Sequence, residues 1–221
     1  MMHTNKTGIV LLALVLMAGL AQGEDKPQTK DGFVPMFDGK TLDGWKTTGN
    51  WVVGEGGVVA LKPRPGEHGW QRYAAYLMTE RTYKYFVLDL EFKIAKEGNS
   101  GVFFRVGDPL DPVKQGIEVQ ILDTHGLENP GQHDCGGVIG TAAPSKNMAK
   151  PAGEWNRYVI TCFENHLTVV LNGENIIDLK LDESAMKDRP VEGHIGFQDE
   201  AKLVWYRNVR IKELSERPQT G

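Results

Sequence analysis

The sequence predicts an all-β protein, built as an antiparallel β-sandwich or jelly roll. After the apolar N-terminal segment, no stretch keeps the apolar spacing of an amphipathic helix. Roughly a dozen short runs of β-branched and aromatic residues are separated instead by turns rich in glycine, proline and asparagine. The clearest run is Tyr85–Ile94, in which every second residue is apolar, as in a strand with one buried face.

The N-terminal segment predicts export. Gly8–Leu20 is uninterruptedly apolar, and Ala21 and Gly23 place small residues where a signal peptidase reads. We expect residues 1–23 to be a signal peptide cleaved after Gly23, with the mature protein in the periplasm or secreted. The apolar run is too short for a comfortable membrane span, although an uncleaved anchor is the alternative.

The rest of the chain is expected to form one domain. Residues 24–31 are charged and predict a linker, residues 32–213 hold the strands, and residues 214–221 form a C-terminal tail. The net charge is −4 and no basic cluster is present, which argues against binding to nucleic acid. No second long apolar run is present, so we expect no membrane association after cleavage. Cys135 and Cys162 either form a disulfide in an oxidising compartment or remain buried thiols.

The first strands after the linker are short. A glycine-rich hairpin at Gly54–Gly57 joins Trp51–Val53 to Val58–Leu61, and a surface loop precedes a strand at Ala75–Met78. Further strands are expected at Gly137–Gly140, Asn156–Phe163, Leu167–Leu171, Glu174–Leu181, Val191–Phe197 and Leu203–Glu213. Asn172-Gly173 is a strong hairpin signal, and Asp182–Arg189 predicts at most one helical turn.

The stretch between Asn99 and His125 carries the candidate site. It predicts two strands, Ser100–Val106 and Gly116–Asp123. Because successive side chains of a strand point to opposite faces, Arg105 is expected on the face opposite Val102 and Phe104. By the same rule Glu118 and Gln120 share the polar face of the second strand. We therefore expect Arg105, Glu118 and Gln120 to converge on one surface.

Six ordered motifs resemble the 3-keto-disaccharide hydrolase domain family over about residues 32–213. They are FDGKTLDGW (37–45), NSGVFFR (99–105), GIEVQILD (116–123), KPAGEWN (150–156), GHIGFQ (193–198) and RNVRI (207–211). The resemblance implies a concanavalin A-like, laminarinase-type jelly roll. It also implies a secreted or periplasmic enzyme acting on 3-keto-glycosides, whose functional partner would be a sugar 3-dehydrogenase.

An ordinary two-carboxylate glycosidase mechanism fits these residues poorly. The catalytic strand of laminarinase-type glucanases is Glu-x-Asp-x-x-Glu, and the positions here are Glu118, Gln120 and Asp123. Retaining glycosidases need two carboxyl groups about 5–5.5 Å apart. Glu118 and Asp123 are an odd number of residues apart, so a regular strand places them on opposite faces.

A 3-keto sugar needs less machinery, because its carbonyl acidifies the proton on C2. We expect Glu118 to act as the base, Arg105 to hold the enolate oxygen, and His125 or His133 to protonate the leaving group. The predicted substrate-binding residues are Gln120, Asp123, Trp70, Lys146 and Asn156. No residue spacing matches a metal motif and no cofactor is assigned, but a divalent cation is an alternative electrophile.

Two other functions are compatible with the same pattern. A non-catalytic carbohydrate-binding module and a conventional β-glucanase both occur on this sandwich. Each candidate residue also has an ordinary alternative: Arg105 and Glu118 as a cross-strand ion pair, Gln120 as a solvated sheet residue, and the two histidines as loop residues.

Overall fold

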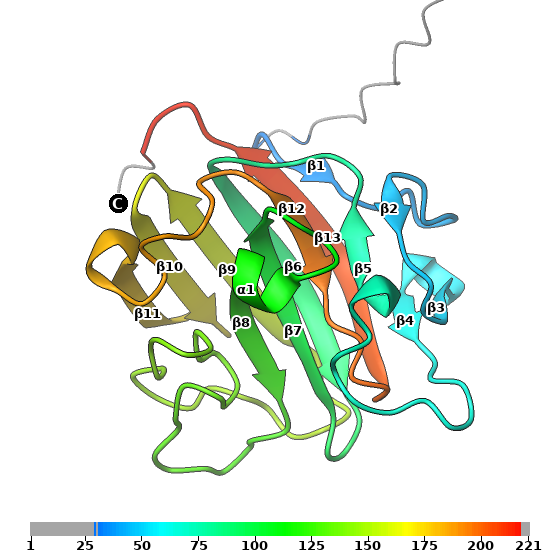
Figure 1. The fold of residues 1–221 in the computed structure, drawn as a ribbon. Helices are drawn as coiled ribbons and strands as arrows, with labels where there is room; N and C mark the ends of the chain where they lie inside the picture. The colour runs from blue at the N-terminus through cyan, green and yellow to red at the C-terminus, as the bar shows by residue number, and fades with distance from the viewer. Residues whose placement is uncertain (1–28, 30, 218–221) are drawn as a thin grey trace, which may run out of the picture.

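A computed structural model, which describes residues 29 and 31–217, contains two antiparallel β-sheets packed face to face (Figure 1). Sheet A follows the order β11-β10-β9-β6-β13-β4-β3, with β1 paired to β13, and sheet B follows β2-β5-β12-β7-β8. Sheet B lies in front of sheet A in this view. The predicted all-β sandwich is confirmed.

The strands of each sheet are as follows. Sheet A contains β1 (Val34–Pro35), β3 (Trp51–Val53), β4 (Val59–Leu61), β6 (Phe86–Ile94), β9 (Asn156–Phe163), β10 (His166–Leu171), β11 (Glu174–Lys180) and β13 (Val204–Glu213). Sheet B contains β2 (Trp45–Lys46), β5 (Leu77–Thr79), β7 (Asn99–Val106), β8 (Ile117–Leu122) and β12 (His194–Phe197). Helical turns are short: η1 (Glu55–Gly57), η2 (Tyr73–Ala75), α1 (Pro112–Gln115) and η3 (Leu181–Glu183).

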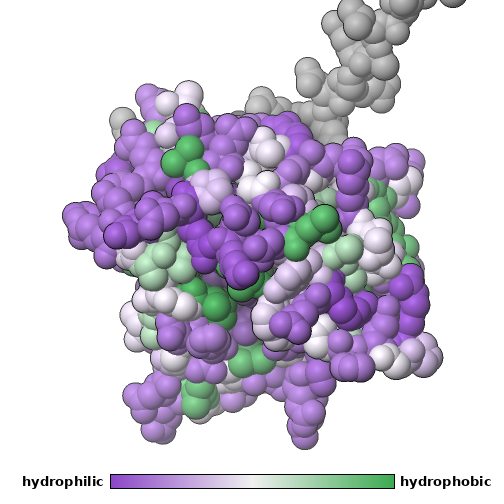
Figure 2. All heavy atoms as spheres, viewed as in Figure 1, coloured by the Kyte–Doolittle hydropathy of each residue, from purple (hydrophilic) through white to green (hydrophobic). Residues whose placement is uncertain are grey.

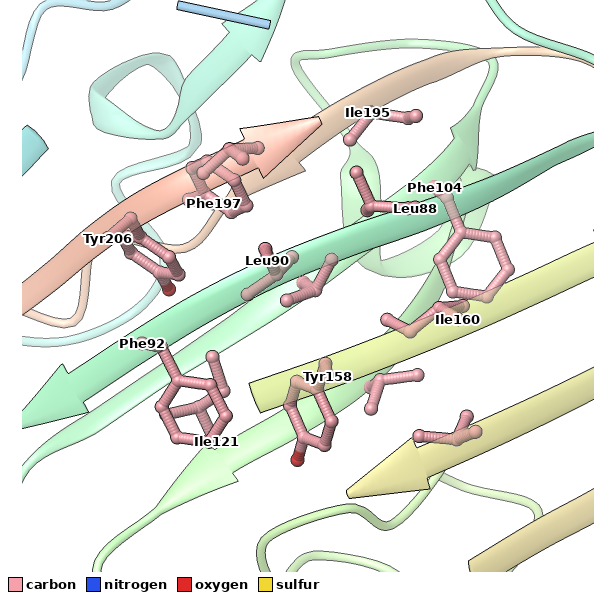
Figure 3. Close-up of a cluster of buried hydrophobic side chains, with 14 of the residues drawn as sticks. Leu88, Leu90, Phe92, Phe104, Ile121, Tyr158, Ile160, Ile195, Phe197 and Tyr206 are labelled. Carbon is pink, nitrogen blue, oxygen red and sulfur yellow. The ribbon is translucent and has the colours of Figure 1, made fainter. Parts of the chain in front are cut away.

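The core lies between the two sheets (Figure 3). Strand β6 supplies it with alternate residues, among them Leu88, Leu90 and Phe92, all fully buried. Phe104 and Ile121 approach from sheet B and complete the layer. Burial of an aliphatic or aromatic side chain contributes about 1.5–3 kcal/mol, so this alternation accounts for the pairing of the two sheets.

The turns follow the sequence signals closely. Asn172 and Gly173 both have positive φ, 53° and 91°, as the central residues of a type I′ hairpin require. They join β10 to β11, as predicted. The predicted strand at Gly137–Gly140 is wrong: only isolated bridges occur there, at Val138. This segment nevertheless runs beside β8, where Gln120 N–H donates to the Gly137 carbonyl over 2.9 Å.

The cysteines are not paired in the structure. Cys135 and Cys162 are both buried free thiols, and the Cys135 sulfur lies 3.4 Å from the Tyr158 hydroxyl. The predicted signal peptide and its cleavage point lie outside the described residues. Within residues 29 and 31–217, no helix is long and apolar enough to span a membrane.

Candidate active site

The outer face of sheet B carries two rows of side chains that cross its strands. In one row, Glu118 of β8 is opposite Phe103 of β7, which is opposite Gly196 of β12. In the next row, Gln120 is opposite Gly101. These residues face away from the sandwich core, since Phe103 belongs to a separate outer cluster with Tyr76, Met78 and Val106. Figure 2 views the molecule from this side, where hydrophobic residues lie among hydrophilic ones.

Gly101 makes room for the Glu118 carboxyl group. A Cβ atom built on Gly101 would overlap the Glu118 carboxylate, so the carboxyl lies directly over this glycine. Across the same glycine, Gln198 N–H donates to the Gly101 carbonyl over 3.0 Å. Glu118, Gln120 and Gln198 therefore surround a position on the sheet that has no side chain of its own.

Glu118 is buried without a neutralising partner. Its side chain is only 9% exposed, and its Oε1 atom has no hydrogen-bond partner within the described residues. Burial, and secondly the negative charge of Glu200, raise the pKa of this carboxyl from an ordinary value of 4.5 to about 8. The Oε1 atom of Gln198 is likewise buried and without a partner. Unpaired buried polar atoms are costly and concentrate at functional sites.

A chain of aromatic rings leads outward from this position. Phe103 and Tyr76 have centroids 5.5 Å apart, Tyr76 and Tyr73 5.9 Å apart, and Tyr73 and Trp70 also 5.9 Å apart. The Tyr76 hydroxyl donates to the Trp70 carbonyl over 2.8 Å, which fixes the loop against the sheet. Trp70 is 39% exposed. The predicted substrate-facing tryptophan thus lies at the outer end of a row that starts beside Glu118.

Arg105 does not join this face. It has φ 53°, and the register between β7 and β12 shifts at this point, as in a β-bulge. The bulge turns the Arg105 side chain toward sheet A, where its Nη2 donates to the Glu164 carbonyl over 2.5 Å. Val106 consequently lies on the outer face with Phe103. The prediction that Arg105 shares a surface with Glu118 is wrong, because period-two alternation ends at the bulge.

The two loop histidines make no hydrogen bond or ion pair with Glu118. His125 and His133 are exposed in the long loop between β8 and β9 (lower left in Figure 1), and the His125 Nδ1 atom lies 2.9 Å from the Ala149 carbonyl. Neither ring contributes to the pKa of Glu118.

Three of the predicted substrate-binding residues have structural partners. Asp123 accepts the Glu97 N–H over 2.9 Å, and Lys146 forms an ion pair of 2.8 Å with Glu174. Asn156 is buried, and its Oδ1 atom accepts hydrogen bonds from Lys150 N–H and the Asn172 side chain. None of these contacts points to the face that carries Glu118.

Sequence reasoning missed Gln198, Tyr76 and Glu200. A side-chain hydrogen bond joins Gln198 to Tyr76, and the charges of Glu118 and Glu200 both act on the Tyr76 hydroxyl. Gln198 closes the motif GHIGFQ, which was a usable signal. Nothing local in the sequence places the other two beside Glu118, because Tyr76 directly precedes β5 and Glu200 follows β12, both far away along the chain.

A second hollow, of about 520 Å³, lies on the outer face of sheet A. Its acids are paired: Asp89 accepts hydrogen bonds from Arg157 and Arg210, and Glu91 from Arg207 and Asn208. This network links β9, β6 and β13, and its acids differ from Glu118, which has no basic partner. In the described part of the chain, no group of three or more His, Cys, Asp or Glu side chains is placed to hold a metal ion.

Comparison with known proteins places the chain in a family. Residues 32–212 match the 3-keto-alpha-glucoside-1,2-lyase-like domain. The chain belongs to this family. A 3-keto-disaccharide hydrolase of Bacteroides thetaiotaomicron is 28% identical over 236 aligned residues, covering 85% of this chain and 80% of the relative.

Solved structures agree on the fold of this 3-keto-alpha-glucoside-1,2-lyase-like chain. A Parabacteroides distasonis protein provisionally classed as a glycosyl hydrolase is 26% identical, with a TM-score of 0.70, covering 82% of this chain and 99% of that one. A Bacillus licheniformis β-glucanase is 14% identical, with a TM-score of 0.51, covering 82% and 97%. The second likeness concerns the fold alone and confirms the glucanase-type sandwich.

Proposed function

We propose that this protein is a hydrolase that cleaves 3-keto-glycosides by elimination of the C1 substituent followed by hydration. The observation that carries the proposal is the buried Glu118 carboxyl on the outer face of sheet B, which has an unpartnered oxygen and no basic neighbour among the described residues. Membership of the 3-keto-alpha-glucoside-1,2-lyase-like family and the name of the Bacteroides relative support the substrate class.

The chemistry follows from the ketone at C3. Removal of the C2 proton gives an enolate, and expulsion of the C1 aglycone then gives an enone to which water adds. This route needs a base, hydrogen-bond donors for the enolate oxygen and an acid for the leaving group. It does not need the pair of closely spaced carboxylates of an ordinary retaining glycosidase.

The donors come from amides rather than from Arg105. The Gln120 Oε1 atom accepts the Ile121 N–H over 3.1 Å, which leaves the Gln120 NH2 group to donate. Gln198 lies across Gly101 from Gln120. Amide donors preorganised on a rigid sheet stabilise charge that develops on a substrate oxygen, and loss of one such donor typically lowers kcat about 10²–10³-fold.

The aglycone would lie along the aromatic rings. Tyr73 and Trp70 offer ring faces to the C–H face of a sugar, and Tyr73 also borders a hollow of about 500 Å³ that Leu110 and Gln71 help to line. This arrangement supports a glycoside with a substantial leaving group, such as a disaccharide.

The proposal also places the protein within a sequence of reactions. A 3-keto sugar must first be made by oxidation at C3, so a sugar 3-dehydrogenase is the expected functional partner. The apolar segment of residues 1–23 supports action outside the cytoplasm.

The test is turnover of oxidised and unoxidised sugars by the purified protein. We expect release of free sugar from 3-keto-trehalose and 3-keto-lactose, and of phenol from a 3-keto-arylglucoside, with no release from the unoxidised compounds. Parallel assays with a chelator test the divalent-cation alternative. Binding of glycans without any turnover would instead indicate a carbohydrate-binding module, and cleavage of unmodified laminarin a β-glucanase.

A further inference from the structure

The proposed reaction needs a base and an acid, and Glu118 alone cannot supply both at once. Its carboxyl is buried over Gly101 and holds a proton at neutral pH, because burial raises its pKa to about 8. A protonated carboxyl is a donor, not a base. A carboxyl that is buried without a hydrogen-bond partner favours its protonated form, so a less buried acid on the same face of sheet B is better suited to act as the base.

Glu200 occupies the right place. It lies two residues beyond Gln198, whose backbone N–H is bound to Gly101 beneath the Glu118 carboxyl. The intervening Asp199 turns away, is fully buried, and binds Arg72 at 3.0 Å. Asp199 also accepts the N–H of Ala201, which has φ 55°, so the backbone on both sides of Glu200 is fixed.

The Glu200 side chain is available for chemistry. It is half-buried, and no hydrogen bond or ion pair engages its carboxylate within the part of the chain that the structure describes. Its negative charge acts on both Glu118 and the Tyr76 hydroxyl. Glu118 interacts electrostatically with Glu200, Tyr76 and Tyr206. Among the described residues, no lysine, arginine or histidine acts on its carboxyl group.

We propose that Glu200 is the base that removes the C2 proton and that Glu118 is the acid that protonates the departing oxygen. This assignment rests on the proposed function and reverses the role expected for Glu118 from the sequence. It follows the general pattern in which two acids in unlike environments divide the acid and base roles between them.

The steps balance in protons and electrons. Glu200 takes the proton from C2, and the C–H electron pair forms the C2=C3 bond while the C3 carbonyl becomes an enolate. When the carbonyl re-forms, the C1=C2 bond forms, the C1–O bond breaks, and Glu118 gives its proton to the departing oxygen. Water then adds at C1 while Glu118 takes a proton from it, and Glu200, whose half-exposed carboxyl has meanwhile exchanged its proton with solvent, protonates C2. The net change is hydrolysis, and both carboxyl groups end as they began.

The experiment separates the two roles with a substrate that cannot be cleaved. The 3-keto derivative of 1,5-anhydroglucitol has an acidic C2 proton and no leaving group at C1. In D2O we expect the wild type and Glu118→Gln to exchange this proton for deuterium, as measured by mass spectrometry. Glu200→Gln should slow the exchange about 100-fold or more.

Leaving-group dependence gives the second measurement. Glu118→Gln should lose about 100-fold or more in kcat on 3-keto-trehalose, yet less than about tenfold on a 3-keto-4-nitrophenyl glucoside, because nitrophenolate leaves without an acid. Glu200→Gln should lose activity on both. The control is Glu183→Gln, which removes an exposed carboxylate paired with Lys180 in the turn after β11 of the other sheet, and which should match the wild type.

Two results would overturn the assignment while the proposed function stands. One is exchange that persists in Glu200→Gln but is lost in Glu118→Gln, and the other is an equal loss on both leaving groups in Glu118→Gln. Thermal melts of each variant exclude misfolding as the cause. If the wild type cleaves no 3-keto-glycoside, the proposed function fails and this inference fails with it.

Discussion

Among the acids that the structure describes, Glu118 is unusual because no cation or hydrogen-bond donor compensates the burial of its Oε1 atom. The buried Asp89, by contrast, accepts hydrogen bonds from two arginines, which lower its pKa against the effect of burial. Burial of a polar group without a hydrogen-bond partner destabilises the folded state even when the group carries no charge. The fold tolerates this cost at Glu118, and we attribute it to the reaction.

The first prediction concerns the stability of Glu118→Gln. The folded protein binds a proton at Glu118 more tightly than the unfolded chain, since the pKa is raised from 4.5 to about 8. Proton binding at Glu118 therefore stabilises the folded state fully below about pH 4.5, and this contribution to the free energy of unfolding is lost as the pH rises through about 8. Glutamine has no charge to bury, so at pH 9 the free energy of unfolding of the variant should exceed that of the wild type by a few kcal/mol. Melting curves at pH 5 and pH 9 test this; parallel curves would contradict it.

The second prediction concerns Gly101→Ala. The new methyl group would overlap the Glu118 carboxylate and displace it, so we expect kcat on 3-keto-disaccharides to fall about 100-fold. The matched control is Gly54→Ala, because Gly54 has a negative φ and its added Cβ would have only one neighbour within 4 Å, at 3.6 Å. Unchanged activity in Gly101→Ala would mean that the position of Glu118 does not matter.

At the residue scale, the sequence predicted part of the site. Glu118 and Gln120 share a face because they are two residues apart in a regular strand, and alternation alone gives this. Gln198 and Glu200 could not be placed, because their proximity to Glu118 depends on which strands are neighbours. A single sequence does not specify that β7 lies between β8 and β12.

At the level of elements, the bulge in β7 decides which residues reach the site. A period-two prediction assumes a regular strand, and one residue with a positive φ at Arg105 moves its guanidinium from one face of the sheet to the other. The register shift that marks the bulge involves β12, far away in the sequence. This is why the strands could be predicted and the orientation of Arg105 could not.

A third prediction follows for Arg105. Arg105→Met removes the hydrogen bond to the Glu164 carbonyl, so the free energy of unfolding should fall by about 1–3 kcal/mol. The kcat on 3-keto-trehalose should stay within about threefold of the wild type, because Arg105 does not face the substrate. A loss of about 10²-fold or more with unchanged stability would restore the enolate-binding role expected from the sequence.

The loop that carries Trp70 provides the fourth prediction. Trp70→Ala should raise KM for a 3-keto-disaccharide about tenfold and leave kcat nearly unchanged, because the ring would stack on the leaving group rather than on the reacting atoms. Trp205→Ala is the control, since Trp205 contacts Lys93 on the outer face of the other sheet. An equal effect of the two substitutions on KM would mean that the row of aromatic rings ending at Trp70 does not contact the substrate.

At the scale of the whole molecule, the two sheets have different roles. The outer face of sheet A is closed by paired charges across three strands, whereas that of sheet B leaves Glu118 and Gln198 with unpartnered oxygens. The sandwich itself was predictable from the alternation in residues 85–94 and from turns such as Asn172-Gly173. The difference between the two outer faces was not predictable, because it depends on which charged side chains are neighbours across strands.

The fifth prediction is the pH dependence of activity. Because Glu118 must carry a proton to serve as the acid, kcat/KM on 3-keto-trehalose should fall about tenfold per pH unit above about pH 8. On a 3-keto-4-nitrophenyl glucoside the fall should be much weaker. A rise through pH 8 on both substrates would identify Glu118 as the base instead.

The most direct test of the account is the origin of the hydrogen at C2 of the product. The enzyme is incubated with 3-keto-trehalose in D2O, and the 3-keto-glucose is reduced at early times with sodium borohydride, which adds no deuterium. The reduced product is examined by mass spectrometry. Product kept in D2O without enzyme is the control for spontaneous exchange. Elimination and hydration predict one solvent deuterium at C2 in every product molecule. Product that keeps the original C2 hydrogen would mean direct displacement at C1 and would contradict the account.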